Sequence, residues 1–221
     1  VSSELLRENQ KYTKGPSIVT PNFVDFELFS PKQEYLKDPS KVRFVYIGRL
    51  ESEKGMETLL DTLQLLKERE DFVFRIVGWG TYLPEMLSAT RKGLHVEYWG
   101  KVSHDEIPEI IADSDVLVLP SLTEGMPAVI LESLASGTPV IASSVGQIPI
   151  VVQDGIEGIL VKPGDSQSLR NAIEKILNNK GLVTTMGKAA RPRVERISGG
   201  YVRIHRKLYE RFVPKLKNTG Q

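Results

Sequence analysis

The sequence has no cysteine, no long apolar run and no excess of charge of either sign. Without cysteine, neither a disulfide framework nor a thiolate metal site can form. The three histidines, His95, His104 and His205, are too scattered to make a metal-ligand cluster. No apolar segment approaches the ~20 residues that a membrane-spanning helix needs, and no signal peptide is visible. We therefore expect a soluble, cytoplasmic globular domain that binds no metal.

Length and charge limit the number of domains and the kind of partner that we expect. The 221 residues suffice for one well-buried α/β domain but are few for two. With 29 basic and 28 acidic side chains, the formal net charge is +1, which does not favour a nucleic-acid partner. The chain begins at Val1 rather than at a methionine, so we expect it to be a piece of a longer product.

Short apolar runs alternate with amphipathic stretches from residue 42 onward, and this alternation predicts repeated strand–helix units. The predicted strands are 42–47, 72–77, 96–99, 115–119, 139–142 and 159–161. The predicted helices are 56–69, 82–90, 106–112, 127–136, 148–152 and 166–177. Repeated units of this kind favour an α/β fold, with a parallel sheet of about six strands and helices on both faces.

The two ends of the chain differ from this repeating core. Residues 1–12 have a helical pattern, residues 17–22 have the pattern of a strand that ends in a turn, and residues 31–41 form a polar linker. Gly199 and Gly200 interrupt the pattern, so a final helix is predicted over 201–213. The predicted organisation has four parts: 1–30, 31–41, 42–198 and 199–221.

Small and polar residues follow five consecutive predicted strands, and ligands bind at these strand ends in an open parallel sheet. The five strand ends are Gly48-Arg49, Gly78-Trp79-Gly80, Gly100-Lys101-Val102, residues 121–126 and residues 143–146. Five such loops in a row favour a ligand-binding cleft. The second loop alone lacks the third glycine and the acidic residue of a dinucleotide fingerprint, so a plain turn is its simpler interpretation.

Arg49 and Lys54 are the cations of this rim, five residues apart in one turn after the first strand. Arginine offers a planar fork of donors and lysine a point charge, so the two side chains can converge on a diphosphate. The alternative is that both are solvated charges that pair with the nearby carboxylates Glu51 and Glu53.

Glu124 and Glu132 flank a predicted transition from a loop to a helix. Pro127 suits the first helical position, and the backbone amides after it are free to bind an anion or a polar ligand. Glu132 lies in a helix that is apolar almost all round, so its carboxylate needs partners, and ribose hydroxyls would serve. The alternative is that Glu124 caps the helix and Glu132 is an exposed helical charge.

These residues, taken in order, resemble the motifs of retaining glycosyltransferase family 4, whose GT-B architecture has two Rossmann-like domains. The segments that carry the resemblance are Gly48-Arg49 with Lys54-Gly55, residues 124–127 with Glu132, and residues 137–140. Residues 20–25 with Phe29 resemble the interdomain segment of that family, and residues 1–6 resemble the last helix of its N-terminal domain. The resemblance implies that this chain is the Rossmann-like, donor-binding half, and that residues 199–221 cross back to an acceptor-binding N-terminal domain.

The resemblance also implies a role for each matched residue. Arg49 and Lys54 would clamp the donor diphosphate and stabilise the charge that grows on it, without a metal or other cofactor. Glu124 would contact the donor sugar, and Glu132 the ribose hydroxyls. The implied catalytic residues are Arg49, Lys54 and Glu124. The implied donor-binding residues are Gly48, Gly78, Gly80, Gly100, Val102, Glu124, Gly125, Met126, Pro127, Ala128 and Glu132, with residues 99–102 along the base.

The implied reaction transfers a sugar from a UDP-, GDP- or ADP-sugar to a hydroxyl acceptor with retained configuration, as in polysaccharide or glycolipid biosynthesis. The partners would be the nucleotide-sugar and the chain's own N-terminal domain, through which the protein would reach a membrane surface. The isolated half is expected to be weakly active or inactive. The alternatives are a non-catalytic nucleotide-sugar-binding subunit and another GT-B enzyme such as an epimerase. Two departures from the family pattern stand at Ile150 and at Ser198-Gly199-Gly200.

Overall fold

The computed structural model describes residues 24–31, 38 and 40–212, with residues 200–212 described by their backbone alone. The helix predicted over 1–12 and the strand predicted over 17–22 lie outside the described residues. So does most of the predicted linker over 31–41.

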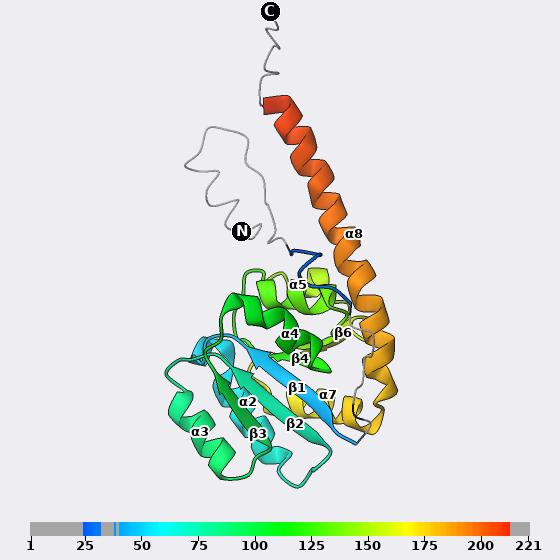
Figure 1. Ribbon diagram of the computed structural model, residues 1–221. Helices are drawn as coiled ribbons and strands as arrows, with labels where there is room; N and C mark the ends of the chain where they lie inside the picture. The colour runs from blue at the N-terminus through cyan, green and yellow to red at the C-terminus, as the bar shows by residue number, and fades with distance from the viewer. Residues whose placement is uncertain (1–23, 32–37, 39, 213–221) are drawn as a thin grey trace, which may run out of the picture.

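The core of the fold is one parallel sheet of six strands in the order β3-β2-β1-β4-β5-β6 (Figure 1). The strands are β1 (Val42–Ile47), β2 (Phe72–Val77), β3 (Val96–Gly100), β4 (Val116–Leu119), β5 (Val140–Ser143) and β6 (Gly158–Val161). The predicted α/β fold is confirmed, with each strand found within one residue of its predicted bounds. The strand order reverses between β1 and β4, and in open sheets such a reversal is where ligands bind.

Helices cover both faces of the sheet. They are η1 (Ser52–Lys54), α2 (Met56–Leu65), α3 (Leu83–Arg91), η2 (His104–Glu106), α4 (Ile107–Ala112), α5 (Ala128–Ala135), α6 (Ile148–Val151), α7 (Ser166–Asn178) and α8 (Gly181–Phe212). The chain moves from β1 to β2 in one direction and from β4 to β5 in the other, so right-handed crossovers place α2 and α5 on opposite faces. α2 packs with α7, and α5 packs with α8.

The long helix α8 differs from the prediction. It runs through Gly199 and Gly200 without a break and also includes residues 181–198, for which no helix was predicted. A glycine in a helix costs only about 1 kcal/mol relative to alanine, which packing elsewhere along the helix can outweigh. That packing is visible at four buried residues with helical spacing: Val183, Met186, Ala190 and Val194. Figure 1 shows the far end of α8 extending away from the sheet.

A charged side chain fastens the two central strands where they begin. The Arg43 backbone amide donates to Asp115 Oδ2 at 2.7 Å, and the Arg43 guanidinium donates to both oxygens of the same carboxylate at 3.2 and 3.1 Å. Asp115 is fully buried. A buried carboxylate with this many donors is fully paired, and removing either partner would leave an isolated buried charge. The pair therefore sets β1 beside β4, and the loops at the other ends of these strands meet as a consequence.

Arg191 of α8 holds the described end of the predicted interdomain segment. Its Nη1 donates to the carbonyl of Phe29 at 2.7 Å and to that of Ala135, the last residue of α5, at 3.0 Å. Its guanidinium also lies 4.7 Å from the ring centroid of Phe26. One side chain thus connects α8, α5 and the segment that precedes the sheet.

The loops after β1 and β4 touch at Gly55. This glycine has φ +76°, and a Cβ built on it would lie 2.0 Å from the Pro120 carbonyl oxygen, which is far inside contact distance. Both the left-handed backbone and the close approach therefore require glycine. Lys54 is placed against the β4 loop as a result.

We expect Gly55→Ala to lower the free energy of unfolding by ~3 kcal/mol or more, because it combines backbone strain with a steric clash. Gly93→Ala is the matched control. Gly93 has φ +71°, and a Cβ added to it would meet nothing within 4 Å, so only the strain of ~1 kcal/mol applies there. Denaturant titration of both variants measures the difference. Equal losses for the two would mean that contact with Pro120 does not constrain this loop.

Candidate functional site

The loops after β1, β2 and β3 are fastened to one another by their backbones. The amide of Leu50 donates to the Trp79 carbonyl at 2.9 Å, and the amide of Gly78 donates to the Gly100 carbonyl at 2.8 Å. These bonds extend the pairing of the parallel strands beyond the ends of the sheet. Three of the five loops predicted to form a cleft therefore lie side by side at the carboxyl edge.

The loops after β4 and β5 join the same edge. The amide of Leu122 donates to the Glu53 carbonyl at 2.9 Å, and the amide of Gln147 donates to the Gly125 carbonyl at 2.9 Å. A Cβ on Gly146 would lie 2.0 Å from the Glu124 carbonyl oxygen, so the β5 loop packs directly against the residue that was predicted to contact a sugar. All five predicted loops are thus brought together.

Lys54 and Glu124 form an ion pair at the centre of this edge. Lys54 Nζ lies 2.7 Å from Glu124 Oε1, and the Ser121 hydroxyl donates to the same oxygen at 2.8 Å. The Glu124 side chain is only 9% exposed, so the pair is shielded from water and held more firmly than a surface pair. The hydrogen bonds of Glu124 Oε1 thus go to Lys54 and Ser121 rather than to the start of α5, whose N-cap is Pro127.

Arg49, the other predicted cation, is exposed and pairs with Glu53 at 2.5 Å from Nη2 to Oε1. This is the pairing that the alternative interpretation expected. Glu51 instead accepts a hydrogen bond from the Thr81 hydroxyl at 2.7 Å and so ties the β1 loop to the start of α3. The Arg49 carbonyl accepts a hydrogen bond from Tyr46, whose pKa is raised because the phenol is buried.

Glu132 is the unusual carboxylate of the site. Burial raises its pKa, and the nearby His104 acts in the opposite sense. The described residues provide its side chain with no hydrogen bond, whereas the buried oxygen of Glu124 has two donors. Half-buried carboxylates without partners are candidates for ligand contacts. The structure thus places Glu132 on α5, the helix that follows the β4 loop, with an unfilled capacity for accepting hydrogen bonds among the described residues.

The start of α5 corrects one prediction. Pro127 has φ −71° and ψ 125° and is the N-cap, so the helix begins at Ala128 rather than at the proline. The fixed φ of proline suits both an extended residue just before a helix and the first residue of the helix. Gly125 and Ala128 are exposed, and Met126 and Pro127 are partly exposed, so the segment is accessible from outside.

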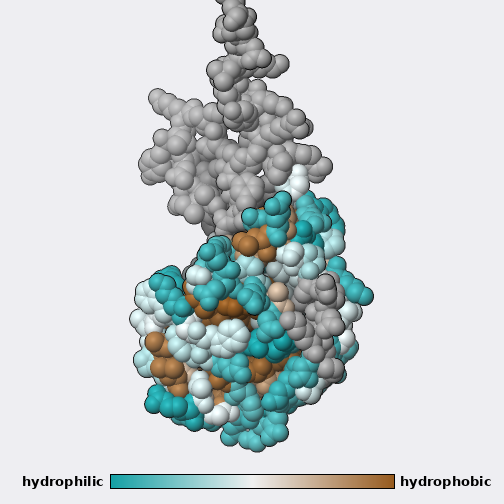
Figure 2. Space-filling model, in the orientation of Figure 1, coloured by the Kyte–Doolittle hydropathy of each residue, from teal (hydrophilic) through white to brown (hydrophobic). Residues whose placement is uncertain are grey.

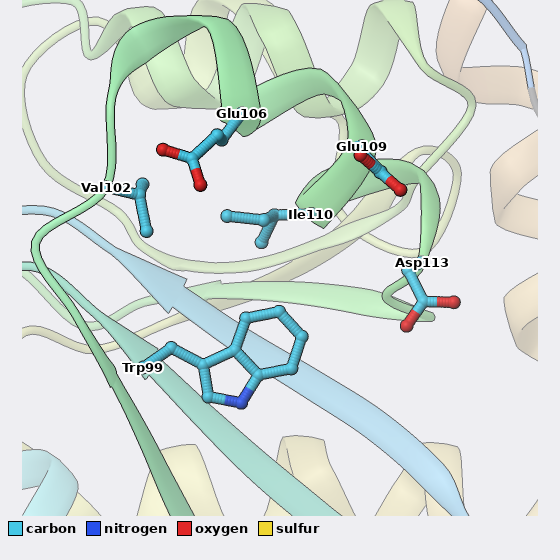
Figure 3. Close-up of a pocket in the computed structure, with 6 residues that line it drawn as sticks. All are labelled: Trp99, Val102, Glu106, Glu109, Ile110 and Asp113. Atoms are coloured by element: carbon cyan, nitrogen blue, oxygen red, sulfur yellow. The ribbon is translucent and has the colours of Figure 1, made fainter.

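A separate cavity of about 370 Å³ lies between β3 and α4 (Figure 3). It is lined by Trp99, Val102, Glu106, Glu109, Ile110 and Asp113. Only Val102 belongs to the predicted donor-binding set, and Trp99 to the segment predicted along the base; Lys54, Glu124 and Glu132 are not part of it. This hollow is therefore beside the predicted site, not at its charged centre.

Two further hollows lie elsewhere on the described residues, one of about 300 Å³ between α2 and α3 and one of about 520 Å³ lined by residues 40–41 and 68–71. Among the described residues, no group of three or more His, Asp or Glu side chains is arranged to hold a metal ion. None of the described helices combines the length and the apolar character that crossing a bilayer requires. Figure 2 shows apolar surface in several separate patches among hydrophilic residues.

The prediction did not include two residues that the structure brings into the site. Ser121 holds the Glu124 carboxylate, and its position three residues earlier in the same loop was the available signal. Trp79 lies between two predicted glycines, but nothing in the sequence distinguished an exposed tryptophan from a buried one.

Glu132→Gln tests whether the carboxylate has a structural role. Burial raises the pKa of the Glu132 carboxyl, so the native state tolerates the charged carboxylate less well than the unfolded chain does. The contribution of Glu132 to the free energy of unfolding therefore falls as the pH rises through the raised pKa. We expect the variant to be at least as stable as the parent at pH 7, with the difference shrinking toward pH 4. Thermal unfolding at both pH values measures this.

The control for simple loss of charge is Glu109→Gln, an exposed carboxylate on α4. A loss of more than ~1 kcal/mol at pH 7 in Glu132→Gln alone would show that the carboxylate supports the fold.

The sequence of this chain is similar to a family of known proteins. A model of the family described as glycosyl transferases group 1 matches residues 30–193. A sulfoquinovosyl transferase of Arabidopsis thaliana is 30% identical over 184 residues, which cover 78% of this chain and 35% of that protein. The chain spans between 35% and 51% of the length of the first curated relatives that it matches.

Two solved structures share the fold. A sucrose-phosphate synthase from Thermosynechococcus elongatus superposes with a TM-score of 0.76 at 27% identity, covering 95% of this chain and 58% of that one. The Anabaena protein HepE, solved in complex with UDP and glucose, has a TM-score of 0.70 at 25% identity and covers 85% of this chain and 55% of that one. In both cases the similar region is little more than half of the solved chain.

Proposed function

The chain belongs to the glycosyl transferases group 1 family, and we propose that it is the donor-binding half of a retaining glycosyltransferase with the GT-B architecture. In this proposal it binds a nucleoside-diphosphate sugar. Transfer to a hydroxyl acceptor also requires a second, acceptor-binding domain. The binding of UDP and glucose by the Anabaena relative supports a nucleotide-sugar as the ligand class.

The observation that carries the proposal is the Lys54–Glu124 pair at the reversal of strand order. Lys54 is held on the β1 loop and Glu124 on the β4 loop, with the nitrogen and oxygen 2.7 Å apart. A shielded ammonium at this position is a ready partner for a phosphate oxygen, and it needs no metal ion to offset the charge. Arg49 lies on the same loop, so two cations can contact one diphosphate.

Each residue then has a chemical task. When the bond between the sugar and the diphosphate breaks, its electron pair stays with the phosphate oxygen, and Arg49 and Lys54 stabilise that growing charge. The acceptor hydroxyl forms the new bond on the same face of the sugar, and its proton passes to the departing phosphate. As Lys54 turns to the phosphate, Glu124 keeps its bond to Ser121 and is free to accept from sugar hydroxyls. Glu132 accepts from the ribose.

The names of the relatives do not favour the alternatives. The Arabidopsis protein is a transferase and the Thermosynechococcus protein a sucrose-phosphate synthase, and neither name is that of an epimerase or a binding subunit. Binding measurements with different nucleotides identify the base, and transfer assays with the acceptor-binding domain identify the sugar and the acceptor.

Calorimetric titration with UDP, GDP and ADP tests the diphosphate assignment. We expect one of the three to bind and to bind equally in the presence of a chelator, because the cations are supplied by the protein. The double variant Arg49→Ala plus Lys54→Ala should lose at least ~100-fold in affinity, since two charge-assisted contacts are removed.

The charge-matched control is Lys67→Ala plus Arg91→Ala, two exposed cations just beyond α2 and at the end of α3. This control should bind like the parent. Undiminished binding by the Arg49 and Lys54 double variant would overturn the diphosphate assignment, and binding that disappears in chelator would overturn the metal-free mechanism.

A further inference from the structure

Trp79 is a large apolar side chain that stands exposed in one of the loops at the carboxyl edge of the sheet. It is 55% exposed, and it lies in the short Trp79 loop, residues 78–80, between β2 and α3. A single exposed apolar residue needs no explanation by itself. Two further observations make this one different: the backbone around it is tightly packed, and its loop lies between the loops that follow β3 and β1.

The Trp79 loop has no freedom to bury its side chain. A Cβ on Gly78 would lie 1.8 Å from the Gly48 carbonyl oxygen, and one on Gly80 would lie 2.4 Å from the Leu50 carbonyl oxygen. The Trp79 carbonyl itself accepts the Leu50 amide at 2.9 Å. The loop is therefore packed against the β1 loop along its whole length, and it holds the indole at the surface.

The order of the strands sets the position of Trp79 in the site. Loops at the carboxyl edge follow one another as the strands do, β3-β2-β1-β4. The segment proposed for the base, residues 99–102, follows β3, and the proposed diphosphate cations follow β1. Trp79 follows β2 and so lies between them. A nucleoside diphosphate that reaches from one segment to the other passes the indole.

The two tryptophans of the chain are not equivalent. The guanidinium of Arg75 lies 4.6 Å from the ring centroid of Trp99, so one face of that indole is already covered within the protein. At the Trp79 ring, Lys101 Nζ lies 5.8 Å from the centroid, near the outer limit of a cation–π contact. Trp79 therefore offers the more accessible aromatic face.

We propose that Trp79 is the stacking platform for the nucleobase of the donor, with Lys101 beside it. Stacking of a base on an aromatic side chain contributes enough binding energy to change affinity about tenfold or more, and it does so for any base. This inference rests on the proposed function, since it assigns a further contact to the same ligand. It adds a binding residue that neither the motifs nor the charged cluster includes.

Fluorescence tests the contact directly, because the chain has only two tryptophans. In Trp99→Phe the sole tryptophan is Trp79, and its emission should be quenched on titration with the nucleoside diphosphate that the parent binds. Pyrophosphate, which carries no base, should cause little quenching.

Affinity provides the second measurement. Trp79→Ala should bind the nucleoside diphosphate about tenfold or more weakly and bind pyrophosphate like the parent, whereas Trp79→Phe should recover most of the loss. Ile156→Ala removes another apolar side chain, 49% exposed, from the turn before β6 and is the matched control, expected to have no effect.

The outcomes separate the two proposals. If the parent binds a nucleoside diphosphate and Trp79→Ala binds it equally well, stacking on Trp79 is wrong and the proposed function stands. If the parent binds no nucleoside diphosphate, both are wrong. Equal losses for the nucleotide and for pyrophosphate in Trp79→Ala would mean that the side chain supports the loop rather than the base, and this too overturns the inference.

Discussion

The close contact between the loops after β1 and β4 determines where the charged side chains of the proposed site lie. Gly55 meets the Pro120 carbonyl with no space for a side chain between them, and the adjacent backbone bond from Leu122 to Glu53 holds the same two loops. Lys54 and Glu124 become neighbours only because of this contact, although 70 positions separate them in the chain. The Arg43–Asp115 pair performs the same task at the opposite ends of these strands.

Much of this arrangement could be predicted from sequence alone, because the relevant signals are local. Runs such as VRFVYI and FVFRIV define buried parallel strands, and a glycine or polar residue after each run identifies the edge where ligands bind. The chemistry of the strand-end residues then limited the choice of ligand to something anionic and rich in hydroxyl groups. The sequence did not predict the pairing of Lys54 with Glu124, which depends on β1 and β4 being adjacent in a sheet whose order reverses between them.

The remaining features depend on contacts between distant parts of the chain, which periodicity does not encode. Helix α8 continues through Gly199 and Gly200 because residues such as Met186 and Val194 pack on the domain. Local sequence patterns do not show whether the free energy of this packing exceeds the helix-destabilising effect of the two glycines. The pairing of Arg49 with Glu53 rather than Glu51 depends on Thr81, which occupies Glu51 from another loop. The exposure of Trp79 depends likewise on how tightly its loop is packed against Leu50.

The paired state of the two cations also has a kinetic consequence. Arg49 and Lys54 are matched by Glu53 and Glu124, so these four side chains carry no net charge before a ligand arrives. A diphosphate approaching from solution therefore experiences little long-range attraction from them, and electrostatic steering cannot raise its association rate far above that of a neutral encounter. In the proposed function, attraction would begin only at short range, when each cation exchanges a carboxylate for a phosphate oxygen. Such a site would select its anion by this exchange at contact distance and not by gathering anions from the surrounding solvent.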